Sequence, residues 1–183
     1  MDLREKFENA LYSVRFVGEE LSVRGVSIYD LSHTLIAFQR IVHKAHLAQE
    51  NRLTKGAFPD KDARQRLALQ IGERRRQSDA FALLPILADL HVQQYMEKLA
   101  DYVFSGIVGY YTGDVLKRLK GETDLNKQIF ISSIYTEVTN IANRVDASGG
   151  VEAINIGAPL KGHSTVATFD VETKTYLSTL KDE

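Results

Sequence analysis

The chain has 183 residues, of which 44% are hydrophobic and 26% charged, and its net charge is −1 at pH 7. These values are typical of a globular protein with a substantial core and exclude extensive disorder. The absence of cysteine excludes disulfides, thiolate metal sites and cysteine nucleophiles. The N-terminus lacks the apolar core of a signal peptide, and no apolar run approaches the roughly 20 residues needed to cross a bilayer. We therefore expect a soluble, cytoplasmic protein without membrane contact.

Charge is unevenly placed along the chain. The window from Arg40 to Arg76 holds ten Lys and Arg against four Asp and Glu, whereas the flanking segments are acidic. Such a window creates a positive patch only if folding keeps these side chains on one face. The length suits a single domain over residues 1–183, with the alternative that it is one domain of a longer protein.

The first elements are two predicted strands and a helix. Alternation of Tyr12, Val14 and Phe16 predicts a strand over 11–17, and residues 21–26 could return as a second strand after a turn at 18–20. The period then becomes helical. Ser27 resembles an N-cap, so a helix is expected from Ile28 to about Asn51.

The next region is ambiguous. Alternation over 67–71 and the apolar residues of 81–85 predict a strand pair whose exposed end is 73–79, while a helix over 60–76 competes with the first strand. A long helix over 88–112 follows. Its apolar stripe changes side after Gly113, which predicts a break there.

The last third of the chain has the clearest helical spacing. Apolar residues from Ile131 to Val145 recur every three or four positions, and a helix is expected from about Asp124 to the Gly149–Gly150 pair. Two strands, 151–156 and 165–169, and a short helix capped by Asp170 complete the chain. The predicted fold is α+β: a two-layer domain of antiparallel strand pairs covered by about three amphipathic helices, in the order ββα-ββ-αα-ββ-α.

One uncharged stretch, 102–113, is a candidate interface within the long helix. Its tyrosines suit protein contacts, and its glycines fall on one strip that another backbone could approach. Either the domain itself covers this strip, which we favour, or a second subunit does. The candidate interface residues are Tyr102, Gly106, Gly109, Tyr110, Tyr111 and Gly113.

The basic window offers a second candidate site. Arg74, Arg75 and Arg76 could contact phosphates or an acidic partner, although a solvated hairpin end is the simpler interpretation. Phe58 is the only aromatic residue in the window, and nucleic-acid binding usually needs several for base stacking.

No pattern identifies catalysis. Phosphate-binding loops and nucleophile motifs are absent, and we expect no catalytic residue, metal or cofactor. His43 and His46 share a helix face, but their spacing is a weak sign of zinc. The sequence therefore favours a non-enzymatic binding domain, an adaptor, sensor or regulatory module that self-associates as a homodimer or binds a protein partner. The alternatives are a nucleic-acid or phosphate-ligand module using the basic window, and a small enzyme with an unrecognised site.

Overall fold

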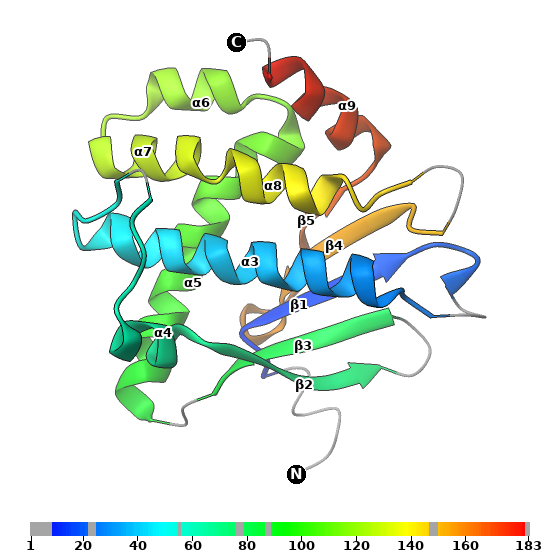
Figure 1. Cartoon of the computed structure of the whole chain (residues 1–183), viewed down its shortest axis with the longest axis horizontal. Helices are drawn as coiled ribbons and strands as arrows, with labels where there is room; N and C mark the ends of the chain where they lie inside the picture. The colour runs from blue at the N-terminus through cyan, green and yellow to red at the C-terminus, as the bar shows by residue number, and fades with distance from the viewer. Residues whose placement is uncertain are drawn as a thin grey trace.

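A computed structural model of the chain describes residues 9–21, 25–54, 56–75, 79–86, 89–146 and 150–181, and for residues 73–75, 79 and 164 it describes the backbone alone. A five-stranded antiparallel sheet in the order β2-β3-β1-β4-β5 forms one layer (Figure 1). Its strands are β1 (Tyr12–Val17), β2 (Leu69–Arg75), β3 (Asp79–Pro85), β4 (Ala153–Ala158) and β5 (His163–Phe169).

The central strand is β1, because its alternation provides one strongly apolar face. Tyr12, Val14 and Phe16 are buried, and Val14 lies between Phe81 of β3 and Ile156 of β4. The intervening Arg15 is exposed. The two hairpins, β2–β3 and β4–β5, therefore flank a strand that contributes apolar contacts along its whole length.

The second layer is helical and covers the apolar face of the sheet (Figure 1). Aromatic contacts join the layers, since the ring of Tyr12 lies 4.7 Å from that of Phe38 and 5.7 Å from that of Phe104. The predicted two-layer α+β fold is thus confirmed. Its helices are α3 (Ile28–Gln49), α4 (Lys61–Leu67), α5 (Leu90–Thr112), α6 (Val115–Gly121), α7 (Leu125–Ser133), α8 (Tyr135–Ala142) and α9 (Val171–Leu180), with a 3₁₀ turn η1 (Pro159–Lys161) between β4 and β5.

Several predicted helix ends are confirmed by hydrogen bonds. The side chain of Ser27 accepts from the Asp30 N–H at the start of α3, and that of Asp170 accepts from the Thr173 N–H at the start of α9. The predicted break at Gly113 is also present. Gly113 has φ 80°, a left-handed conformation that ends α5 before α6 begins at Val115.

Two predictions on element boundaries need correction, and one open alternative is resolved. Leu21, Gly25 and Val26 do not continue a strand, and residues 22–24 lie outside the described part of the chain. The described part of the ambiguous region 60–76 contains a helix followed by a strand, α4 and then β2. The expected single helix through Ile131 to Val145 is interrupted at Ile134, between α7 and α8. At the second and third of these points the structure has long-range hydrogen bonds, from the Gln39 side chain to the Leu67 carbonyl and from Lys44 to the Ser133 carbonyl.

Candidate functional site

A concave surface of about 780 Å³ lies between the C-terminal half of α3, the segment that follows α3, and α7. We call it the Phe58 groove. Its apolar lining consists of Leu53, Ala57, Phe58, Leu125 and Ile129, and its polar lining of Lys44, Thr54, Gln128, Ser132 and Ser133. Phe58 and Leu125 expose 62% and 67% of their surface, so two large apolar side chains from opposite walls meet solvent here.

The segment that carries Phe58 is fixed at both ends. At the end of α3, Asn51 adopts φ 58°, and the Arg52 N–H donates to the Leu47 carbonyl, which completes a Schellman cap. At the other end, the Asp60 side chain accepts from the Ala63 N–H and starts α4. Figure 1 shows this segment passing beside α7 before it reaches α4. The position of Phe58 is therefore set by two helix caps.

Two side chains orient the Phe58 ring. The ring of His43 on α3 meets it edge-on, with centroids 5.9 Å apart and planes at 78°. The guanidinium carbon of Arg64 on α4 lies 5.2 Å from the ring centroid, a cation–π contact. Phe58 thus belongs to a cluster that joins α3 and α4 at the edge of the groove.

Lys44 connects the groove to the core. Its Nζ donates to the Ser133 carbonyl at 2.6 Å and to the Glu137 carboxylate at 2.9 Å. Glu137 is only 5% exposed, so the ion pair is largely desolvated. Because α7 ends at Ser133 and α8 begins at Tyr135, the ammonium lies at the C-terminus of one helix and the carboxylate near the N-terminus of the next, which both helix dipoles favour. This pair lies at the point where the long predicted helix is interrupted.

The two histidines of α3 have different partners. His46 is buried, and its Nδ1 lies 2.5 Å from the hydroxyl of Tyr95 on α5. Burial, together with the neighbouring His46, Arg64 and Arg40 side chains, lowers the pKa of His43 from 6.5 to about 4, and burial also lowers the pKa of His46. Both rings are therefore neutral at pH 7. Among the described residues, no group of three or more His, Asp or Glu side chains is placed to hold a metal ion.

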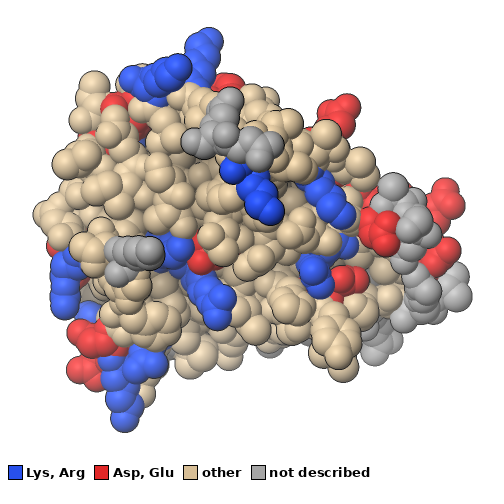
Figure 2. Space-filling view, turned by 45° about the horizontal axis from the view of Figure 1, so that its top comes forward, with Lys and Arg blue, Asp and Glu red and all other residues tan. Residues whose placement is uncertain are grey.

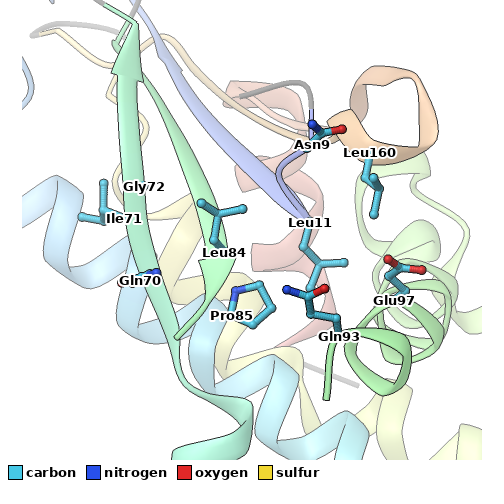
Figure 3. Close-up of a pocket in the computed structure, with 10 residues that line it drawn as sticks. All are labelled: Asn9, Leu11, Gln70, Ile71, Gly72, Leu84, Pro85, Gln93, Glu97 and Leu160. Atoms are coloured by element: carbon cyan, nitrogen blue, oxygen red, sulfur yellow. The ribbon is translucent and has the colours of Figure 1, made fainter. Parts of the chain in front are cut away.

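A second cavity, of about 620 Å³, lies where the edge of the sheet meets the first turns of α5 (Figure 3). Its apolar lining is Leu11, Ile71, Leu84, Pro85 and Leu160, and Gln93 and Glu97 line it from α5. Glu97 is the one ionisable side chain among its described lining residues. This cavity offers no cation, and no exposed aromatic ring is described in its lining, so it carries less chemistry than the Phe58 groove.

Three of the six candidate interface residues, Gly106, Gly109 and Tyr110, pack within the domain. A Cβ at Gly106 would lie 2.2 Å from the Phe130 ring, and one at Gly109 would lie 2.7 Å from the Val115 Cα. Tyr110 is buried and donates its hydroxyl to the Ile131 carbonyl. The glycine strip thus receives α7 and the start of α6. This is the internal arrangement that the sequence analysis favoured.

The remaining members of that set lie nearer the surface. Tyr102 is half-buried, with its ring 5.0 Å from that of Phe130. Tyr111 and Gly113 line a smaller cavity of about 340 Å³ together with Tyr176 of α9. An intersubunit role for these residues stays a prediction.

The arginine run is described only in part. Arg74 and Arg75 belong to β2, but their side chains, like the whole of Arg76, lie outside the described structure. Figure 2 shows Lys and Arg side chains scattered between acidic ones on the face in view. On that face the described residues form no continuous basic patch, and a role of this run in phosphate binding stays a prediction.

Sequence reasoning missed the groove because its walls are 67 or more positions apart in the chain, at Phe58 and Leu125. The one available signal was an aromatic residue in a loop within the basic window.

No described helix is long and apolar enough to span a bilayer. We found no match to the chain among models of protein families, curated proteins or solved structures.

Proposed function

We propose that this chain is a non-enzymatic binding domain and that the Phe58 groove is its ligand site. The supporting observation is a concave, mostly apolar surface on which Phe58 and Leu125 expose more than half of their area. Ligand sites for small molecules are concave and mostly apolar, with volumes of about 300–1,000 Å³ and a few polar groups. The groove has this size and composition.

The polar lining favours binding over catalysis. Of the described residues that line the groove, Lys44 alone is ionisable, and its ammonium is held by Glu137 and the Ser133 carbonyl. General acid–base catalysis needs a titratable group within reach of the substrate and free to exchange its proton. A ligand would instead meet fixed hydrogen-bonding groups, as in a sensor or regulatory module.

Self-association is a separate part of the proposal. Tyr111 and Gly113 line a concave surface beside Tyr176, and tyrosines supply large contact area at low entropy cost. Native mass spectrometry tests it. A dimer that Tyr111→Ser converts to a folded monomer supports the proposal, and a strict monomer of the wild-type chain contradicts it.

The ligand site can be tested with Nile red, a neutral fluorescent probe of apolar surfaces. We expect the wild-type chain to enhance its fluorescence, and Ile129→Asp to abolish most of the enhancement because the charge would lie in the groove wall. Leu116→Asp on α6 is the matched control, since Leu116 is 40% exposed and Ile129 is 38% exposed. Leu116 is not among the described lining residues of the groove.

Equal enhancement by the wild-type chain and by Ile129→Asp, with both folded by circular dichroism, would contradict the assignment of the site. So would an equal loss in Ile129→Asp and Leu116→Asp. The comparison of the two variants separates a specific site from general surface hydrophobicity.

A further inference from the structure

The groove has the features of a site for a flat ring. Phe58 exposes 62% of its surface, while Arg64 lies over its ring and the ring of His43 contacts it in a T-shaped arrangement. An exposed aromatic ring whose orientation is fixed by its neighbours loses little freedom when another ring stacks on it. Stacking on such a ring is a common way to bind nucleic-acid bases.

The α7 side of the groove is also apolar. Leu125 and Ile129 lie one helical turn apart on α7 and are both exposed, so they add apolar surface to the lining that includes Phe58. Thr54, Gln128 and Ser132 add hydroxyl and amide groups to the lining. These groups donate and accept hydrogen bonds. The Gln128 side-chain amide nitrogen already donates to the Leu119 and Glu122 carbonyls, so Thr54 and Ser132 supply the remaining hydroxyl groups. A heteroaromatic ring, apolar on its faces and polar at its edge, would match both kinds of lining group.

The charges near Phe58 are mainly positive. Arg64 contacts the ring, and Arg40 is close enough for its charge to lower the pKa of the neighbouring His43. Both arginines are exposed. Lys44 lines the groove itself, where Glu137 balances its charge. Asp60, the N-cap of α4, accepts from the Ala63 N–H and lies near Arg52 and Arg66, and Asp62 is an exposed acidic residue within α4.

We propose that the Phe58 groove binds a nucleotide-like ligand, a heteroaromatic ring carrying a phosphate, with the ring stacked on Phe58 and the phosphate beside Arg64. This inference rests on the proposed function and names the ligand class of the same site. In this proposal the basic window from Arg40 to Arg76 contributes to phosphate binding through Arg64. A free nucleotide and a base of a single-stranded nucleic acid share this chemistry, and the test below distinguishes them.

The test measures binding of AMP, adenosine, inorganic phosphate and an oligodeoxyadenylate by isothermal titration calorimetry. We expect AMP to bind, adenosine to bind more weakly, and phosphate alone to give no signal up to about 10 mM. Rising salt weakens AMP binding and leaves adenosine binding unchanged, because only the phosphate contact is ionic. An oligodeoxyadenylate that binds at least about tenfold more tightly than AMP identifies a single strand as the source, and equal affinity identifies the free nucleotide.

Variants separate the two contacts. Phe58→Leu keeps an apolar side chain and removes the stacking surface, so AMP affinity falls by about tenfold or more. Arg64→Gln reduces AMP affinity to that of adenosine. Arg66→Gln is the matched control on the same helix, and it changes AMP affinity by less than about twofold because no cation–π contact joins Arg66 to Phe58 in the described structure.

The inference is overturned if AMP shows no binding at about 10 mM, or if its affinity is the same in the wild-type chain and in Phe58→Leu. Equal losses in Arg64→Gln and Arg66→Gln would also overturn it, because they would indicate a non-specific charge effect. Nile red binding distinguishes failure of the proposed ligand class from failure of the proposed binding site. A probe that binds the wild-type chain but not Ile129→Asp, and that AMP does not displace, leaves the binding site in place and refutes only the ligand class.

Discussion

Replacement of Gly109 by alanine tests the packing of α6 against α5. A Cβ at this position would lie 2.7 Å from the Val115 Cα and 3.1 Å from its Cβ, whereas ordinary contact begins at 3.4 Å. Val115 is 2% exposed and begins α6, so relief of the clash requires movement of backbone. Alanine adds up to about 1 kcal/mol of helix propensity, and overpacking costs typically about 1–3 kcal/mol. We expect the upper part of that range, and a net loss of about 2 kcal/mol.

The measurement is urea unfolding followed by far-UV circular dichroism, with size-exclusion chromatography of the folded variant. Gly121→Ala is the control, because Gly121 is also helical and a Cβ there would have nothing within 4 Å. We expect that control to be neutral or to gain up to about 1 kcal/mol. A Gly109→Ala variant that is as stable as the wild-type chain, and that differs only in its oligomeric state, would refute the internal role of the glycine strip.

Three other perturbations test the site and its supports. Lys44→Met leaves Glu137 buried without its cation and should cost about 3–5 kcal/mol in urea unfolding; Lys44→Met with Glu137→Leu should recover most of it, and no recovery would argue against the pair. Because the pKa of His43 is lowered from 6.5 to about 4, the unfolded chain binds that proton more tightly, so this part of the stability is present above pH 6.5 and lost as the pH falls toward 4. His43→Gln should reduce that loss by about 1–2 kcal/mol, less than the full shift implies because the side chain is partly exposed, and an unchanged pH profile would contradict it. Asp170→Ala removes the cap of α9 and should cost about 0.5–2 kcal/mol, whereas Asp170→Asn should retain most of it.

The sequence alone determined features that depend on near neighbours. The caps at Ser27 and Asp170, the end of α5 at Gly113 and the buried alternation of Tyr12, Val14 and Phe16 all appear where the sequence predicted them. A side chain within about three residues satisfies each cap, and a fixed period places each apolar stripe. The two-layer α+β class followed from these periods, since every amphipathic face needs a cover.

Contacts between distant segments decided the rest. The break at Ile134 coincides with the place where Lys44, 89 positions earlier than Ser133, binds that residue's carbonyl. Gln39 likewise helps to set the boundary between α4 and β2, because its side chain accepts from the Leu69 N–H and donates to the Leu67 carbonyl. No local period encodes either contact.

The candidate site depends entirely on contacts between distant segments. In the sequence, Phe58 is one aromatic residue in a loop, and Leu125 and Ile129 are apolar positions at the start of a helix. Only the packing of α3 against α7 and α8 brings the two walls together, with the Lys44–Glu137 pair between them. The physical reason is that local periodicity determines which residues form a helix or strand, while a groove is defined by which elements pack side by side.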